Sequence, residues 1–476
     1  MGLEIKSEDK RVALKIFLTV YLISALFFKP SPTFYRFVSL TKSLVHYKTT
    51  SIDQVHEEAK LPFTDEVKFG AHIYIDINPG LSFIAAVSYF PYAKFILPKL
   101  EQFSAWDALL DFRVSQFVMG LSTVIFFTAL LTAVFFLALK RVGCGRRKAL
   151  GFTALLYAGT PILFYSLSIG NGQNSLEMSL VFFAFLLLGA GPFGVYQALL
   201  SGLLLGLAVF TSITSIFFFP LFLVILWKSK PWLTLVWLTG IFLGLTPLLV
   251  YNFVSFGNPL RISSHRLFDD IWRLNFGGVF HQIWNLLLDP RVGLIPFSPF
   301  FLALALFFKE IITTKRNRLI LSGVLIYLFA AAVSFCLTLI AGPTNRETWY
   351  LLFGGGGCRY LLPVIPFLVY VLASVKLTSG WKWSVTFLSF FVSLWINVPA
   401  LFWSGGVASV FNHLLLFLKG GFHSYTIDLM KDLLILAGFN VEHFSLLPMA
   451  ATLIFLLWWI WVGDRWVRDG LKQDKA

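Results

Sequence analysis

The chain has 476 residues, of which 57% are hydrophobic, 17% aromatic and only 13% charged, and its mean hydropathy is +0.78. Because soluble globular proteins carry about 25% charged residues, this composition excludes a water-soluble enzyme, a disordered chain and a coiled coil, and it predicts an integral membrane protein. The net charge of +14, from 38 basic and 24 acidic residues, could indicate an acidic partner such as nucleic acid. In a membrane protein, however, the placement of the charges first sets the topology.

The first 28 residues predict a cytoplasmic start followed by a retained membrane span. Basic residues between Lys6 and Lys15 lead into an apolar run at 12–28, and no small-residue cleavage site follows it. Residues 29–79 are then expected on the outer face of the membrane.

The next apolar run, at 80–97, is expected to lie along the outer membrane surface. If it crossed the membrane, the basic cluster between Lys140 and Lys148 would fall outside, against the positive-inside rule. Pro91 and Lys94 interrupt the run, and its aromatic residues suit the headgroup region. Residues 29–112 therefore form one long outer loop with interfacial helices, and a second span at 113–139 returns to the cytoplasm.

Later apolar runs alternate with basic loops that all fall on the cytoplasmic side. The further spans are predicted at 149–166, 175–190, 195–210, 212–227, 232–252, 294–308, 319–340, 360–375, 383–402 and 448–463. The pattern predicts an all-α polytopic protein of the plasma (inner) membrane, with about twelve transmembrane helices and both termini in the cytoplasm.

Seven regions follow from this topology. They are a cytoplasmic N-terminus with the first span (1–28), an outer loop with interfacial helices (29–112), a transmembrane bundle (113–252), an outer loop (253–293), a second bundle with a glycine-rich outer turn (294–402), an outer segment (403–447), and a last span with a cytoplasmic tail (448–476). Most acidic residues fall in the three outer regions. Because long loops are commonly functional, the chemistry is expected there.

Four segments, taken in order, resemble a known family. They are Tyr35–Asp53 with Thr64–Asp65 and Gly70–Ser82, then Tyr251–Leu260, then Leu288–Pro299, then Gly354–Pro363. This ordered set is similar to bacterial GT-C fold glycosyltransferases, which include protein O-mannosyltransferases and the lipid A aminoarabinose transferase. The resemblance implies transfer of a sugar from a polyprenyl-phosphate donor to a lipid, glycan or protein acceptor on the outer face, with a carboxylate of the first outer loop as general base.

Asp53, Asp76 and Asp65 are the candidates for that base. An acceptor hydroxyl must lose its proton as it attacks the anomeric carbon, and a carboxylate can accept that proton. Asp53 lies in a Ser-Ile-Asp context that matches the family pattern, and Asp76 stands just before the Pro79–Gly80 turn. Asp65 follows a threonine and could equally cap a helix. Related enzymes often carry an acid close to the first span, where residues 31–34 offer none.

Arg359, Arg291 and Arg36 are the candidates for binding the donor phosphate, whose negative charge needs a cation near the bilayer surface. Arg359 follows a run of glycines, which would let backbone N–H groups approach an anion. Alternatively, Arg359 could extend to lipid headgroups, Arg291 could pair with nearby Asp289, and Arg36 could simply flank the first span. The candidates for contacts with the sugar or acceptor are His72, Trp349, Tyr350 and Asp289.

We expect no metal, no other cofactor and no nucleic-acid partner. The cysteines Cys144, Cys336 and Cys358 form no CxxC pair, which excludes a cysteine zinc site and a disulfide scaffold. The Asp269–Asp270 pair lacks a sequence context that would complete a coordination shell.

Three other functions stay open. A transporter would place ionisable groups in mid-membrane and leave inverted repeats, whereas the predicted spans carry almost no charge apart from Glu177 and the chain has no internal repeat. A polysaccharide polymerase or ligase that uses a lipid-pyrophosphate donor would direct several basic residues at the diphosphate. A non-catalytic membrane scaffold would account for the missing early acid.

Overall fold

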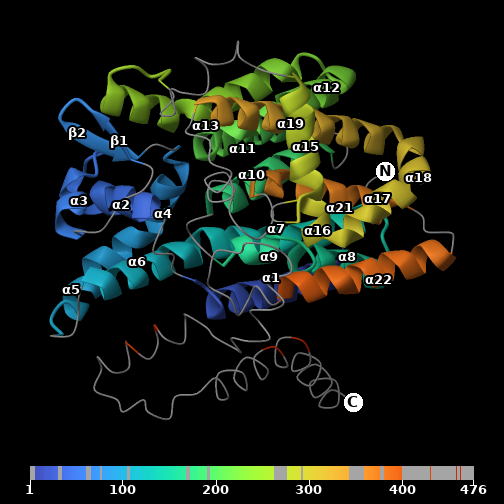
Figure 1. The fold of residues 1–476 in the computed structure, drawn as a ribbon, viewed down its shortest axis with the longest axis horizontal. Helices are drawn as coiled ribbons and strands as arrows, with labels where there is room; N and C mark the ends of the chain where they lie inside the picture. The colour runs from blue at the N-terminus through green and yellow to red at the C-terminus, as the bar shows by residue number, and fades with distance from the viewer. Residues whose placement is uncertain are drawn as a thin grey trace.

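The computed structural model describes most of the chain up to residue 398. The described residues are 6–29, 35–59, 66–75, 78–103, 108–167, 172–189, 193–261, 276–290, 293–341, 359–375 and 380–398, with Leu429, Asp432, Leu457 and Trp461. The structure is mostly helical (Figure 1). A chain this apolar must satisfy its backbone polar groups without water, and helices do so within a single segment.

The N-terminal part combines the first long helix with the elements of the expected outer loop. These are α1 (Ser7–Leu26), α2 (Tyr35–Lys42), the π-helical turn η1 (Ser43–Tyr47), α3 (Asp53–Ala59), β1 (Glu66–Phe69), β2 (His72–Ile75), α4 (Gly80–Pro91), η2 (Tyr92–Ile96), α5 (Leu97–Leu100) and α6 (Ala108–Ser122). The antiparallel pair of β1 and β2 corrects the all-α expectation.

Helices and helical turns make up the rest of the described chain. They are α7 (Val124–Arg141), α8 (Arg146–Ala158), α9 (Ile162–Tyr165), α10 (Gly172–Gly189), α11 (Val195–Thr211), η4 (Ile213–Phe218), α12 (Phe219–Ser229), α13 (Leu233–Phe256), α15 (Phe276–Leu288), α16 (Leu294–Phe297), η6 (Pro299–Phe301), α17 (Leu302–Leu306), α18 (Phe308–Thr313), α19 (Lys315–Ala341), η7 (Arg359–Val364), α21 (Ile365–Ser374) and α22 (Gly380–Asn397).

Five helical stretches among the described residues are long and apolar enough to cross a membrane. They are Gly80–Leu100, Leu110–Arg141, Gly172–Gly189, Leu233–Phe256 and Lys315–Val333. The chain is therefore a multi-pass membrane protein, but the predicted count of twelve spans is not confirmed. Two predicted spans are interrupted. The run at 149–166 breaks between α8 and α9 at Gly159–Pro161, and the run at 294–308 divides into short helical pieces around Pro296 and Pro299, because proline cannot donate its backbone N–H within a helix.

Among the described helices, α11 and α13 make the most extensive contact with each other. Gly202 and Gly206 of α11 face Gly240 and Gly244 of α13, so the two backbones touch. A Cβ atom built at Gly202 would lie 2.0 Å from the carbonyl oxygen of Trp237. Small residues spaced four apart allow this close approach, which favours dispersion contacts between helices in a membrane. The C-terminal ends of the pair reach the elements of the expected outer loop, since Gly80 lies against Phe210 and Ser255 bonds to Thr50.

The charge that stood out in the predicted spans holds the segment between α11 and α12 in place. Glu177 of α10 is completely buried, and its Oε1 accepts hydrogen bonds from Thr214 Oγ1 at 2.6 Å and Ser215 Oγ at 2.9 Å. These bonds tie the start of η4 to α10. A buried polar group held in this way stabilises a break between helices, because the freed groups find partners inside the protein.

The helix at 80–100 packs along the elements of the outer loop. It contacts α2 and α6, and a Cβ at Gly80 would lie 2.7 Å from the carbonyl oxygen of Phe210 at the end of α11. Its other side exposes Val87, Phe90 and Phe95. The helix is long and apolar enough to span a membrane, and its placement along the membrane surface stays a prediction.

Ion pairs in the described part of the chain join residues that the predicted topology puts on the same face. On the expected outer face these pairs are Lys42 with Asp111 and Arg113 with Asp432, and on the expected cytoplasmic face they are Lys140 with Asp9, Arg146 with Glu8 and Lys382 with Glu310. Figure 1 places β1, β2 and α3 at one end of the long helices and α18 at the other. This sorting agrees with two chemically distinct faces, while the orientation of the termini stays a prediction.

Candidate functional site

A β-hairpin forms the centre of the candidate site. Strands β1 and β2 pair so that Phe69 lies opposite His72 and Val67 opposite Tyr74. Gly70 has a φ of +62°, a left-handed conformation that favours glycine and closes the turn. The sequence carries only a weak signal for this hairpin, because β-branched and aromatic residues lie on both sides of Gly70 but alternate with other residues only in the first strand. It was outweighed by the helical pattern of the rest of the chain.

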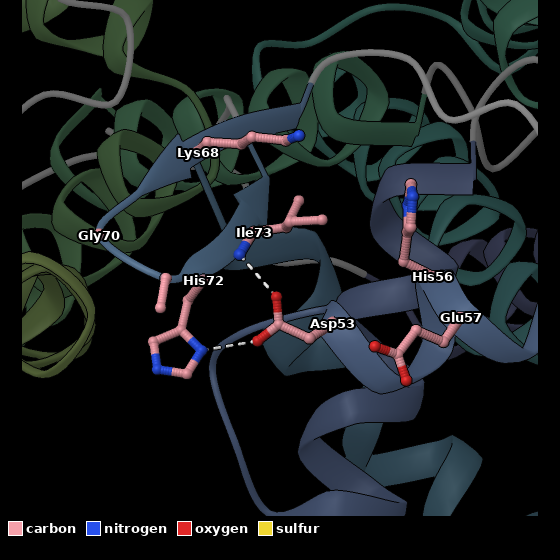
Figure 2. Close-up of a pocket in the computed structure, with 8 residues that line it drawn as sticks. Asp53, His56, Glu57, Lys68, Gly70, His72 and Ile73 are labelled. Atoms are coloured by element: carbon pink, nitrogen blue, oxygen red, sulfur yellow. Dashed lines mark hydrogen bonds and ion pairs between the residues drawn. The ribbon is translucent and has the colours of Figure 1, made fainter.

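Asp53, one of the predicted bases, docks against the free edge of β2. The Ile52 N–H donates to the Ile73 carbonyl oxygen at 2.8 Å, and the Ile73 N–H donates to Asp53 Oδ1 at 2.7 Å. Asp53 Oδ2 lies 2.7 Å from Nδ1 of His72 (Figure 2). The first turn of α3 and the hairpin are therefore joined through one carboxylate. Asp53 and His72, predicted separately as base and substrate contact, are brought together.

The surroundings of Asp53 favour its charged form. Partial burial on its own would raise the pKa of Asp53, but hydrogen bonds from His72, Ile73 and Ser51 outweigh burial and hold the pKa below its usual value. The carboxylate is therefore ionised across the physiological pH range, and it can accept hydrogen bonds but cannot donate them.

A polar cavity of about 270 Å³ opens beside this pair. It is lined by Asp53, His56, Glu57, Lys68, Gly70, Ala71, His72 and Ile73. Side chains of both charges and two imidazoles could hydrogen-bond to the hydroxyl groups of a sugar or to a polar acceptor. Among the described residues, no three His, Cys, Asp or Glu side chains are grouped so as to hold a metal ion.

A second cavity, of about 190 Å³, lies at the C-terminal ends of α11 and α13. Its lining residues are Asn78, Pro79, Ile213, Leu248, Leu249, Tyr251, Asn252, Pro259, Leu260 and Arg261. The Arg261 guanidinium stacks over Phe69 of β1, 4.1 Å from the ring centroid, and over Phe256 at 5.2 Å. Arg261 is not among the predicted phosphate ligands, although it directly follows the Asn-Pro-Leu end of the second family-like segment.

The first two family-like segments pack against each other around this hairpin. A small core joins the outer loop to the end of α13, and its buried members are Leu40, Ile52, Tyr74, Ile75, Tyr251 and Phe256. Ser255 Oγ donates to Thr50 Oγ1 at 2.9 Å, and Asn78 Nδ2 donates to the Val209 carbonyl oxygen at 2.7 Å. Residues about 200 positions apart in sequence thus build one site.

Other predicted site residues lie apart from these two cavities. Arg36 is buried in α2 with its guanidinium 5.1 Å from the ring of Phe37. Arg359 begins η7 and donates to the Tyr360 hydroxyl at 3.3 Å. Asp289 follows α15, and its carbonyl oxygen accepts a hydrogen bond from the Gly293 N–H. Five further predictions fall outside the described residues: Asp65, Asp76, Arg291, Trp349 and Tyr350.

Comparison with solved structures finds similarity to ArnT from Cupriavidus metallidurans. The apo form aligns over 94% of this chain and 74% of that chain, with a TM-score of 0.47 and 13% sequence identity. The form bound to undecaprenyl phosphate aligns over 82% of this chain and 63% of that chain, with a TM-score of 0.43 and 16% identity. The chain thus spans less than two thirds of the latter. No protein-family model matches the sequence, and no curated protein matches it.

Proposed function

We propose that this protein is a membrane glycosyltransferase that moves a sugar from a polyprenyl-phosphate donor to a polar acceptor on the outer face of the membrane. The sequence support is the ordered set of segments that resemble GT-C glycosyltransferases. The observation that carries the proposal is the convergence of two unlike cavities on one hairpin. Phe69, which pairs with His72 across the hairpin, is the ring on which Arg261 stacks.

The polar cavity is suited to the acceptor and to the transfer step. A hydroxyl that attacks the anomeric carbon needs a nearby group to take its proton, and the Asp53–His72 pair supplies one. The open, hydrophilic lining admits an acceptor from water. The acceptor hydroxyl could belong to a lipid, a glycan or a protein.

The second cavity is suited to an amphiphilic donor. Ile213, Leu248 and Leu249 offer apolar contact for a prenyl chain, and Arg261 offers a guanidinium for a phosphate. The neighbouring surface of α13 exposes apolar side chains, including Val250 and Phe253, as a lipid-facing helix does. A lipid could therefore enter sideways from the bilayer.

A monophosphate donor fits this lining better than a pyrophosphate donor. A diphosphate would call for several cations, whereas the described lining of the second cavity supplies Arg261. Arg359 and Arg36, which lie apart from this cavity, stay candidates for phosphate contacts. Asp65 and Asp76 stay candidates for the general base and Arg291 for a phosphate contact. Trp349, Tyr350 and Asp289 stay candidates for contacts with the sugar or the acceptor.

The proposal is tested with purified protein in lipid vesicles. A panel of labelled sugars on undecaprenyl phosphate is supplied with a bacterial glycolipid and glycan extract, and labelled product is measured. The wild-type protein is expected to transfer one of these sugars. Asp53→Asn should lower kcat by about 100-fold or more, the usual contribution of acid–base catalysis, and Arg261→Ala should mainly raise the KM for the donor.

The matched control is Glu58→Gln, which removes an exposed carboxylate from the same helix as Asp53 and should leave transfer unchanged. Two results would contradict the proposal. One is a wild-type protein that transfers no sugar from any polyprenyl-phosphate donor, and the other is an Arg261→Ala variant whose donor KM equals that of the wild type.

A further inference from the structure

Both carboxylate oxygens of Asp53 are already engaged. Oδ1 accepts the Ile73 N–H and Oδ2 contacts the His72 ring, each at 2.7 Å. Each oxygen keeps a second lone pair, so these contacts restrict but do not abolish the access of a substrate proton to the carboxylate. Hydrogen bonds to an ionised carboxylate also make it a weaker base, which agrees with the lowered pKa of Asp53. Asp53 is therefore better suited to orient a neighbour than to take the proton itself.

The contact with Asp53 fixes the protonation pattern of the His72 ring. Since an ionised carboxylate only accepts hydrogen bonds, Nδ1 of His72 carries a proton and donates it toward Asp53. In the neutral ring the free lone pair then lies on Nε2. Figure 2 shows this second nitrogen on the side of the ring that faces away from Asp53. The His72 side chain is 59% exposed, so a substrate can reach it.

We propose that His72 is the catalytic base of the transfer reaction, acting through Nε2, and that Asp53 is its positioning residue. The inference rests on the proposed glycosyltransferase function and deepens it. It replaces the direct role that the sequence resemblance implied for a first-loop carboxylate.

The transfer step then balances as follows. The acceptor O–H bond breaks and its proton goes to Nε2 of His72, while the acceptor oxygen forms a new bond to the anomeric carbon. The bond between that carbon and the phosphate oxygen breaks, and the polyprenyl phosphate leaves with the electron pair. The resulting imidazolium is stabilised by Asp53 through its Nδ1–H, and it releases the proton to water when the product leaves.

Other titratable groups at this cavity have different partners or positions. His56 of α3 lies 3.3 Å from the carboxylate of Glu66 on β1, so the second imidazole belongs to a separate pair. Glu57 of α3 and Lys68 of β1 bring opposite charges to the lining. In Figure 2 the Lys68 side chain points away from Asp53. Asp53 and His72 both line this cavity, whereas Glu66, the partner of His56, is not among its lining residues.

Chemical rescue tests the proposal. In the vesicle assay, His72→Ala should lose about 100-fold or more in kcat with little change in the donor KM, in line with loss of a general base. Added imidazole should restore at least tenfold of that loss, because a free ring can occupy the space left by the side chain. The control variant His281→Ala removes an exposed histidine from α15 and should be unaffected by imidazole.

The role of Asp53 is tested by combination. If the two residues act as a unit, the Asp53→Asn/His72→Ala double variant should be no slower than the worse single variant. Asp53→Glu should recover part of the activity that Asp53→Asn loses. If the loss of kcat in the double variant equals the product of the two single losses, the two residues act independently, and the positioning role of Asp53 is overturned.

The outcomes also separate this inference from the proposed function. A wild-type protein without transfer activity would overturn both. An active wild type with a fully active His72→Ala variant, or with a His72→Ala loss that imidazole does not restore, would overturn the inference alone.

Discussion

The α11–α13 pair and the β1–β2 hairpin meet at the end of α13, yet different kinds of contact hold them in place. Between the helices, glycines bring backbone against backbone, with Gly244 so close that a Cβ there would lie 2.4 Å from the Leu203 carbonyl oxygen. The hairpin is held to α3 mainly by the hydrogen bonds of Asp53, and its polar end is open to solvent.

This difference separates scaffold from chemistry. Backbone contacts between close helices leave no room for substitution and do not depend on pH. Polar contacts around Asp53 can be altered by a single proton or a single side chain. A site that must bind and release a proton needs polar contacts such as those of Asp53. The close backbone contacts between helices hold such a site in position.

The largest effect is expected where the scaffold is tightest. Gly202→Ala introduces a methyl group 2.0 Å from the Trp237 carbonyl oxygen, so the two helices must move apart. Overpacking of this kind costs about 3 kcal/mol. The thermal unfolding midpoint in detergent, followed by loss of the monodisperse folded protein, should fall clearly.

Gly151→Ala is the matched control for this variant. Gly151 lies in α8, and a Cβ there would meet nothing within 4 Å. Alanine favours a helix over glycine by about 1 kcal/mol, so this variant should be as stable as the wild type or slightly more stable. Equal midpoints for the two variants would show that close backbone contact does not define the scaffold.

The sequence predicts the scaffold better than the site. Long apolar runs and the sidedness of basic residues indicate the helices because these signals are local and repeated. The apolar run at 149–166 predicts one continuous helix, but in the structure one helix ends at Gly159–Pro161 and a new one follows. A run of apolar residues reports lipid compatibility, whereas turn residues decide where a helix stops.

Tertiary contacts account for most of what the sequence did not predict in the site. Asp53 was a candidate through its local motif, but its partner His72 lies 19 residues away, across a hairpin whose short strands carry little periodic signal. Arg261 gains its setting from Phe69 of β1, nearly 200 positions earlier. Such pairings depend on how distant segments pack, and one sequence carries no local pattern for them.

A smaller, pH-dependent effect is expected at the hairpin. Because the folded-state pKa of Asp53 is lowered, its carboxylate stabilises the fold above the unfolded pKa of about 3.9. That stabilisation is lost as pH falls through the lower folded-state value. Amide hydrogen exchange at Ile73, corrected for the intrinsic pH dependence, should be steady from neutral pH down to about 5 and accelerate roughly tenfold below that folded-state pKa, as loss of a charge-assisted hydrogen bond predicts.

Asp53→Asn provides the comparison for this measurement. It removes the titrating group, so the extra acceleration in acid should disappear, while exchange in α13 should be the same in both proteins. An acid response at Ile73 that persists in Asp53→Asn would assign it to another group and would separate Asp53 from the stability of the hairpin.

The smallest effect is expected at the hydrogen bond that links the two regions. Ser255→Ala removes the 2.9 Å bond from α13 to Thr50, which should cost about 1 kcal/mol and speed exchange around residues 49–53 by about fivefold. Ser322→Ala, which loses only a bond to the Arg318 carbonyl oxygen of its own helix, is the control and should leave that segment unchanged. If Ser255→Ala also loosened the middle of α11 and α13, the hairpin and the helix pair would unfold as one unit. If faster exchange is confined to residues 49–53, the α11–α13 pair keeps its structure while the site around the hairpin moves.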